Sequence, residues 1–286
     1  SVNAIIHAGA TPVLVDVHPD TWTIDPDCIK KAITKKTKAI MPVHIYGHPC
    51  HMNEIIEIAK DHHLLIIEDC AEALGSTYEG QPVGSFGDAA AFSFFGNKII
   101  STGEGGMVIF SDSSNYEKAF ILRDHGMAKN RRYWHEVVGY NYRMTNMQAA
   151  IGVAQMEIID KILKRRKRNH NIYNKNLKKI PFLNLQPLQS WAESSFWLNT
   201  ILLNQSSVFD RDELASKLEK NGIETRPTFI SMHMMPPYKK YKTQNIYTIS
   251  KRISDTGISL PSSTSLTENE IIKICNKINS FYLNRT

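Results

Sequence analysis

The first half of the chain alternates short apolar runs with helical patterns, and this alternation limits the folds open to it. The apolar runs are rich in β-branched and aromatic residues and predict strands at 12–17, 38–46, 63–70, 89–95 and 106–111. Patterns of helical period lie at 26–33, 51–63 and 115–126. Nearly continuous apolar strands separated by helices are typical of a mostly parallel sheet flanked by helices. The sequence therefore predicts an α/β fold.

The second half of the chain has a different character. A long helical pattern covers residues 144–180, and Thr145 or Asn146 is placed to cap its start. Beyond it, strands are expected at 196–203 and 222–230, and amphipathic helices at 208–222 and 267–283. This mixture predicts a smaller α+β domain. We place the boundary inside the long helix, so that residues 1–165 form the large domain and 166–286 the small one.

Composition excludes several classes of protein. The chain has 286 residues, of which 42% are hydrophobic and 22% charged, as in ordinary globular proteins. No apolar run approaches the roughly 20 residues of a membrane span, and no secretory signal pattern is visible. The four cysteines show no C-x-x-C spacing and are expected to be reduced thiols. We expect a cytoplasmic protein with no membrane partner.

The formal net charge is +6, and much of the basic excess lies at 161–179. A nucleic-acid surface is one interpretation. The solvated face of a helix is favoured, because apolar residues recur through the run and no nucleic-acid-reading motif accompanies it. We therefore expect no nucleic-acid partner, although a positive field would suit a substrate that carries phosphates.

Two ionisable residues follow predicted strands. Asp69 closes the apolar run 64–69, so it is expected at the carboxyl edge of the sheet, where open α/β folds bind ligands; a helix cap or a solvated acid is the alternative. Lys98 follows the run 89–95. A lysine for an aldehyde and an acid for a ring nitrogen together suit pyridoxal phosphate. Ser93, on the incoming strand, could donate a hydrogen bond to the phosphate.

Three long segments, 42–55, 66–108 and 139–156, resemble the DegT family of pyridoxal-phosphate nucleotide-sugar aminotransferases. The resemblance implies a fold type I (aspartate aminotransferase-like) enzyme with a mostly parallel central sheet. It also implies transfer of an amino group from glutamate to a nucleotide-linked keto sugar for surface polysaccharide synthesis. A lysine at position 98 argues against the dehydratases of the family, which resemble these enzymes but carry histidine there.

Residue roles follow from the resemblance at matching positions. Lys98 is expected to be the catalytic lysine and Asp69 the partner of the ring nitrogen. Ser93 is expected to bind the phosphate. Glu72 stands near the cofactor where many members have glutamine, and its role is less closely defined by the resemblance.

The family also assembles its sites at a homodimer interface. The resemblance implies that Asn141 and Arg143 reach the neighbouring subunit's site, Asn141 at the cofactor phosphate and Arg143 at the substrate. Tyr133, Trp134 and Arg226 are further candidates to contact the nucleotide-sugar, with packing as the alternative for each.

Two segments, 124–152 and 222–238, resemble the branch of the family that acts on GDP-4-keto-6-deoxy-D-mannose and yields GDP-perosamine. A UDP- or dTDP-linked keto sugar is an alternative substrate, and a non-catalytic fragment with a vestigial fold is another reading. Family members carry a further segment before the position of Ser1, with a Gly-Thr turn that binds the phosphate. We therefore expect an N-terminal portion to be absent here and the chain as it stands to bind pyridoxal phosphate poorly.

Overall fold

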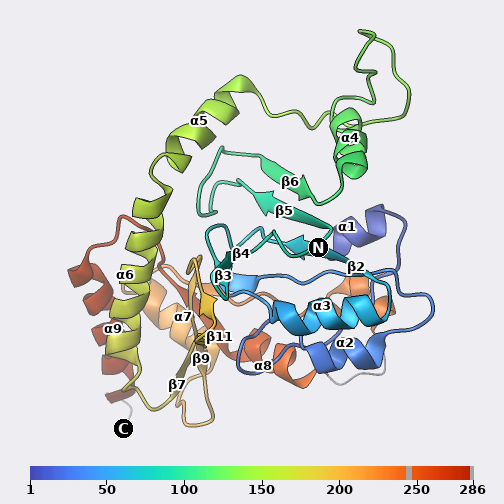
Figure 1. The fold of residues 1–286 in the computed structure, drawn as a ribbon. Helices are drawn as coiled ribbons and strands as arrows, with labels where there is room; N and C mark the ends of the chain where they lie inside the picture. Colours follow the sequence, from blue (N-terminus) through green and yellow to red (C-terminus); the bar gives the residue numbers. More distant parts are fainter. Residues whose placement is uncertain (243–246, 284–286) are drawn as a thin grey trace.

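The structure is a computed structural model that describes residues 1–242 and 247–283. Its central sheet has the strand order β1-β2-β5-β6 (Figure 1). The strands are β1 (Ala39–Ile40), β2 (Leu65–Asp69), β5 (Ala89–Ser93) and β6 (Gly106–Phe110). β1 and β5 both pair with β2 in parallel, and β6 pairs with β5 antiparallel. The predicted mostly parallel sheet is confirmed, with one antiparallel edge strand.

Helices α2 (Pro26–Ala32) and α3 (Met52–Asp61) lie together against this sheet (Figure 1). Asp25 begins α2 by accepting the Asp27 N–H, which satisfies one of the free donors at a helix start. The two helices and the first strands share one apolar cluster, built from Ile29, Ile40, Cys50, Met52, Ile55, Ile58, Ala59, Ile66 and Tyr78. This cluster fixes β2 and therefore the position of the residues that follow it.

The second half of the chain forms an antiparallel sheet in the order β10-β11-β9-β7. The strands are β7 (Leu183–Leu185), β9 (Asn199–Leu203), β10 (Arg226–Pro227) and β11 (Gly257–Leu260). Around it lie α6 (Ile159–Leu177), α7 (Arg211–Glu219), α8 (Thr248–Thr256) and α9 (Glu268–Leu283). A third small sheet joins the halves of the chain, because β3 (Thr77–Tyr78) pairs with both β4 (Gln81–Pro82) and β8 (Ala192–Glu193). The predicted domain boundary near residue 165 falls within α6 and stays a prediction.

Two predicted strands are wrong. Residues 12–17 form only an isolated β-bridge, between Val17 and Ile24. Asp16, in the same segment, instead binds residues in the C-terminal half of the chain. The carboxylate of Asp16 accepts the backbone N–H groups of Ile249 and Ser250, at 2.9 and 2.8 Å. Of 222–230, only Arg226–Pro227 is strand. A proline offers no N–H to a ladder, and this strand lies at the edge of its sheet.

The helix predicted over 144–180 is two helices, α5 (Asn146–Met156) and α6. Ile158 leaves the helical conformation, with φ −118° and ψ 13°. The predicted cap is confirmed at Thr145, whose hydroxyl accepts the Gln148 N–H in a capping box. The break lets α6 pack against the second sheet while α5 extends beyond the body of the molecule (Figure 1).

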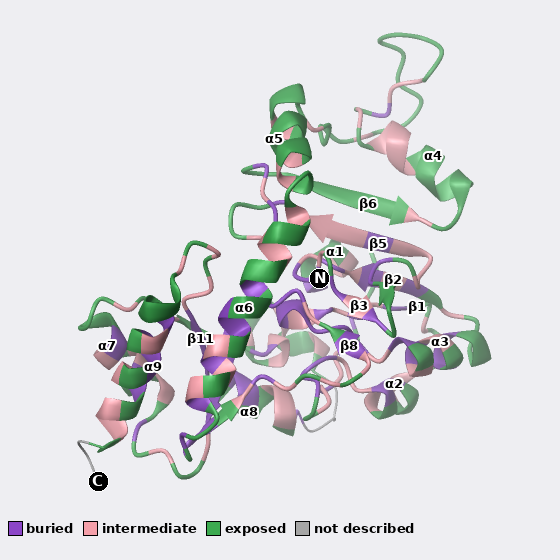
Figure 2. Ribbon diagram, turned by 60° about the vertical axis from the view of Figure 1, so that its left-hand side comes forward, coloured by how far each residue is buried: buried purple, intermediate pink, exposed green. Residues whose placement is uncertain are grey.

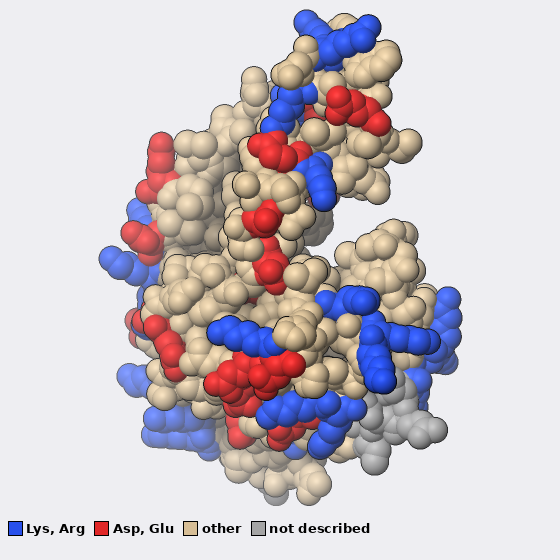
Figure 3. All heavy atoms as spheres, turned by 45° about the vertical axis from the view of Figure 1, so that its right-hand side comes forward, with Lys and Arg blue, Asp and Glu red and all other residues tan. Residues whose placement is uncertain are grey.

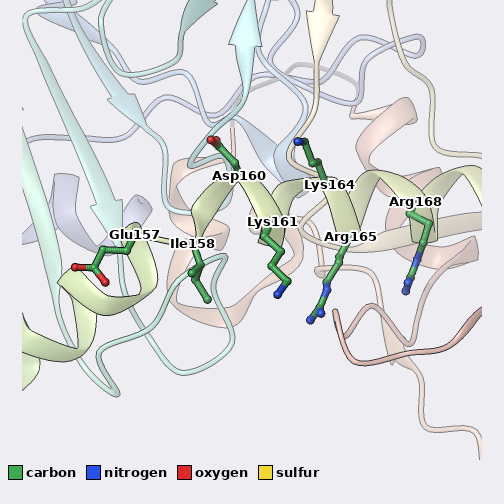
Figure 4. A pocket seen from close by; sticks show the side chains of 7 residues that line it. All are labelled: Glu157, Ile158, Asp160, Lys161, Lys164, Arg165 and Arg168. Carbon is green, nitrogen blue, oxygen red and sulfur yellow. The ribbon is translucent and has the colours of Figure 1, made fainter.

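Most of the basic run 161–179 lies on α6, which ends at Leu177. Its lysines are solvent-exposed, as the solvated-face interpretation predicts, but Arg166 is buried and donates to the Trp197 carbonyl at 2.8 Å. A pocket of about 510 Å³ lies at the first turns of α6 (Figure 4). Its lining residues are Glu157, Ile158, Asp160, Lys161, Lys164, Arg165 and Arg168, so both signs of charge meet there. Figure 3 shows the same interleaving of acidic and basic side chains over much of the body.

A projecting arm leaves the body after β6. It consists of α4 (Ser113–Leu122), the loop 123–145 and α5, and it is largely exposed (Figure 2). Among the described residues, no helix combines the length and apolar character that crossing a membrane requires. All four cysteines are free thiols, and Cys50, Cys70 and Cys275 are buried.

Candidate active site

Three of the predicted site residues meet at the carboxyl edge of the central sheet. Asp69 ends β2, Glu72 lies in the turn that follows, and Lys98 lies beyond the end of the neighbouring β5. The amino group of Lys98 is 3.7 Å from Oε1 of Glu72, and both side chains are largely shielded from solvent, at 14% and 11% exposed. Adjacent parallel strands therefore bring together residues that lie far apart in sequence, as the strand pattern predicts.

Asp69 is held by its own backbone and by two donors. Its N–H donates to the carbonyl of Pro42, as part of an isolated parallel bridge between Val43 and Asp69 beyond the end of β1. Its Oδ1 accepts the Ala71 N–H at 3.1 Å, and its Oδ2 accepts the hydroxyl of Ser1 at 2.6 Å. A carboxylate with these partners is oriented and still has lone pairs for a ligand.

Lys98 also contacts an aromatic ring that the sequence did not predict for the site. Its ammonium nitrogen lies 4.0 Å from the ring centroid of Trp197. The indole N–H of Trp197 donates to the carbonyl of Asn97 at 2.8 Å, which fixes the ring beside the lysine. A cation over an aromatic face is attracted by the ring quadrupole. The lysine amine is thus held between a carboxylate and an indole.

A tight turn supplies the other partner of Glu72. Tyr46, with φ 54°, and Gly47, with φ 88°, both have positive φ within the 3₁₀ turn η1 (Ile45–Gly47). The Tyr46 N–H donates to Oε2 of Glu72 at 2.8 Å. The Tyr46 ring is buried and stacks on Trp197 and Phe229. No sequence signal could place these three rings together, because they belong to three separate segments.

Gly47 is a sensitive position of this turn. A β-carbon there would meet the Ser195 hydroxyl at 2.6 Å and the Phe196 nitrogen at 3.0 Å, at a φ that favours glycine. We expect Gly47→Ala to lower the free energy of unfolding by about 2 kcal/mol or more, through strain and displaced contacts. Urea unfolding measures this, with Gly80→Ala as the control, because its added β-carbon meets open space at a similar φ of 80°. Equal losses in the two variants would show that only backbone strain matters.

The carboxyl group of Glu72 has an unusual ionisation. Burial raises its pKa to about 7, although the Tyr46 N–H and the charge of Lys98 favour the ionised form. The charge of Asp69 acts in the same direction as burial. The charges of Asp69 and Lys98 therefore both act on the Glu72 carboxyl group, which gains or loses its proton near neutral pH.

Ser93 is the last residue of β5 and is partly buried. Its hydroxyl oxygen accepts the Phe95 N–H at 3.3 Å, and its O–H remains available as a donor. Its predicted role at the phosphate stays a prediction. The other predicted residues lie outside the Asp69, Glu72 and Lys98 cluster.

Four of those residues belong to the projecting arm. Arg143 pairs with Asp124 at 3.1 Å, and Asn141 forms an isolated bridge with the same residue. Tyr133 and Trp134 are 76% and 51% exposed. Among the described residues, none of the four has a hydrogen bond or ion pair to Lys98.

Arg226, in the second half of the chain, is exposed and lies 3.8 Å from Glu224. Its predicted contact with a nucleotide-sugar stays a prediction, as do those of the arm.

A buried cluster on the other side of β2 has a structural role. Oε2 of Glu68 accepts from His44 Nε2 at 3.1 Å and from the Gly84 N–H at 2.7 Å, and Oε1 accepts from Phe86 and Gly87. The Cys50 N–H donates to the other ring nitrogen of His44. His44 and Glu68, with Cys70 nearby, have metal-ligand chemistry, but both ring nitrogens of His44 are already engaged.

The residues present fit pyridoxal phosphate. The site offers a shielded primary amine for an aldehyde, an oriented carboxylate for a ring nitrogen and a partly buried hydroxyl for a phosphate. The amine and the two carboxylates lie at one sheet edge and are bounded by the flat ring of Trp197. This donor set has the chemistry that the cofactor requires.

Comparison with known proteins identifies the family of the chain. The family model described as the DegT/DnrJ/EryC1/StrS aminotransferase family matches residues 1–279. GDP-perosamine synthase from Escherichia coli O157:H7 is 46% identical over 283 residues, which are 99% of this chain and 76% of the relative. GDP-perosamine synthase from Caulobacter vibrioides is also 46% identical, over 96% of this chain and 74% of the relative.

Solved structures show the same fold. Helicobacter pylori PseC, an aminotransferase, superimposes with a TM-score of 0.93 at 27% identity, over 99% of this chain and 76% of that one. S. venezuelae DesV superimposes with a TM-score of 0.90 at 32% identity, over 98% and 74%. The fold type I architecture and the pyridoxal-phosphate dependence expected from the sequence are confirmed. The chain belongs to the DegT/DnrJ/EryC1/StrS family of pyridoxal-phosphate-dependent aminotransferases.

Proposed function

We propose that this aminotransferase transfers the amino group of glutamate to C4 of GDP-4-keto-6-deoxy-D-mannose and forms GDP-perosamine for a surface polysaccharide. The single observation that carries the choice of sugar is 46% identity to two GDP-perosamine synthases over nearly the whole chain. Similarity to the synthase of Vibrio cholerae, at 41% over 99% of this chain, supports the same substrate.

Each side chain of the site has a distinct role in the proposed reaction. Pyridoxal phosphate supplies an aldehyde that captures amines and a ring that accepts the electron pair released when a carbon loses its proton. Lys98 takes the proton from Cα of glutamate and later delivers a proton to C4 of the sugar. Asp69 holds a protonated ring nitrogen, since its carboxylate is fixed at the sheet edge with free lone pairs. Ser93 binds the phosphate.

Assays with matched keto sugars test the substrate. GDP-, UDP- and dTDP-linked 4-keto-6-deoxy sugars are offered side by side with glutamate and pyridoxal phosphate, and the amino sugar is detected by mass spectrometry. We expect product from the GDP sugar at a kcat/KM at least about 100-fold above the others, because a site built to hydrogen-bond one base rejects another strongly. A preference for the UDP or dTDP sugar would contradict the proposal.

We further propose that the active form is a homodimer whose interface includes β6 and the projecting arm. This region exposes many large apolar side chains, and a contiguous exposed apolar patch marks an interaction surface. The exposed side chains are Met107, Val108, Ile109, Tyr116, Tyr133, Trp134, Val137, Val138, Tyr140, Tyr142, Met147, Ile151, Val153 and Met156. In such a dimer Asn141 and Arg143 would serve the partner's site.

Sedimentation velocity tests the dimer. We expect the wild-type protein to sediment as a dimer and Val138→Asp/Ile151→Glu as a monomer with at least about 10-fold lower activity, because charges opposed to an apolar face cost several kcal/mol. Leu188→Glu is the control, since Leu188 is exposed in the loop between β7 and β8. A monomeric wild-type protein would contradict the proposal.

We also propose a cytoplasmic location. Its support is the set of four free cysteines, which suits a reducing compartment.

A further inference from the structure

We propose that Glu72 is a positioning residue for Lys98: its carboxylate tethers the amino group against Trp197, and gain of one proton at Glu72 releases that amine. The inference deepens the proposed function, because it rests on Lys98 as the catalytic lysine. It concerns the lysine itself and can be tested without cofactor or substrate.

Two hydrogen bonds fix the position of Glu72. Its Oε2 accepts the Tyr46 N–H at 2.8 Å, and its backbone carbonyl accepts the Ser195 hydroxyl at 3.2 Å. The other oxygen, Oε1, is the one that faces Lys98, at 3.7 Å. The indole of Trp197 bounds the amine at 4.0 Å. Within the part of the chain that the structure describes, the lysine head therefore has two partners, Glu72 and Trp197, and only Glu72 can change its charge.

Three charged or titratable groups face Glu72 from the elements packed against it. Lys98 favours its ionised form, while Asp69 and burial favour its protonated form. Tyr46 contributes a buried phenol whose pKa is raised by burial. The balance sets the pKa of Glu72 at about 7. Below that pH the carboxyl is neutral and the Lys98 ammonium has no ion pair with it. Above it the carboxylate and the ammonium are paired.

This arrangement suits a lysine that must alternate between roles. An ammonium paired with a carboxylate keeps its proton firmly and is not a nucleophile. Once Glu72 is neutral, Lys98 gives up a proton to solvent more readily, and the resulting neutral amine can attack a carbonyl carbon or remove a proton. Glutamine at this position could accept the lysine N–H but could not bind or release a proton. A glutamate at position 72 thus couples the reactivity of Lys98 to one protonation event.

Competitive acylation of the cofactor-free wild-type protein with trace acetic anhydride tests this. Peptide mass spectrometry gives the rate at Lys98 relative to Lys60, an exposed lysine of α3. Ionisation of Glu72 makes Lys98 harder to deprotonate, so the ratio should fall about tenfold between about pH 6 and pH 8. A ratio that is flat in the wild-type protein overturns the proposal, and no variant is needed for that result.

Variants then test whether Glu72 causes the pH dependence of acylation at Lys98. Glu72→Gln should keep the ratio high and independent of pH, whereas Glu72→Asp, which retains a charge, should keep a pH dependence. Glu54→Gln, at a partly exposed position of α3 beside His51, is the matched control and should behave as wild type. A Glu72→Gln protein that folds, as judged by circular dichroism, and keeps the wild-type profile overturns the assignment to Glu72. Inactivity toward the GDP sugar would refute the proposed function and leave this measurement intact.

Discussion

Replacement of Lys98 by alanine is expected to lower turnover by about 10⁴-fold, the upper range for loss of a positioned acid–base group. The amine is the one that Glu72 and Trp197 hold at the sheet edge beside Asp69. Because we propose that this amine both captures the cofactor aldehyde and moves the substrate proton, we expect no neighbouring side chain to replace it. The measurement is amino-sugar formation under saturating glutamate and pyridoxal phosphate, compared with wild type.

A second readout separates chemistry from folding. Lys98→Ala should also lose the change in visible absorbance that accompanies covalent capture of pyridoxal phosphate, while its far-ultraviolet circular dichroism stays unchanged. Lys60→Ala, which removes an exposed lysine of α3, should retain both activity and absorbance. If Lys98→Ala kept more than a tenth of the wild-type rate, the assignment of Lys98 as the catalytic lysine would be wrong.

Replacement of Glu68 by alanine should cause a large loss of stability. The completely buried carboxylate accepts three backbone N–H groups, from Gly84, Phe86 and Gly87, and the ring N–H of His44. Without it, these donors have no acceptor in a site closed to solvent. Breaking a buried charged network of this kind costs about 3–5 kcal/mol. Urea unfolding at pH 7 measures the loss, and Glu57→Ala, on the exposed side of α3, should stay within about 0.5 kcal/mol of wild type.

The Glu68 carboxyl group also makes the free energy of unfolding depend on pH. Burial alone would raise the pKa of Glu68, but hydrogen bonds from His44 and the Gly84 and Gly87 N–H groups lower it overall. A carboxyl whose folded-state pKa is lowered stabilises the protein above its unfolded pKa and loses that contribution as pH falls through the folded value. The difference in unfolding free energy between wild type and Glu68→Ala should therefore shrink in acid below about pH 4. A difference that is constant with pH, or smaller than about 1 kcal/mol at pH 7, would contradict this account.

Part of the architecture could be predicted because its signals are local. The strands that carry Asp69 and Ser93 are apolar runs bounded by turns, and Thr145 heads a capping box. The errors arose where distant contacts overrode local pattern. Residues 12–17 have strand composition, but Asp16 binds the N terminus of α8 instead of pairing in the sheet. The helix break at Ile158 interrupts a sequence of helical period throughout.

The sequence by itself determined the fold class and the family, and it indicated Lys98 and Asp69 as candidate site residues. It could do so because periodicity, strand ends and long ordered motifs depend on residues that are neighbours in the chain. Only the tertiary structure decided what surrounds them. Tyr46 and Trp197 reach the site from segments about 150 residues apart in the chain, and their rings stack there. The ionisation of Glu72 likewise depends on burial and on charges beyond its own segment. The ring stacking and the pKa of Glu72 depend on residues that are close in space but distant in the chain, so local sequence does not predict them.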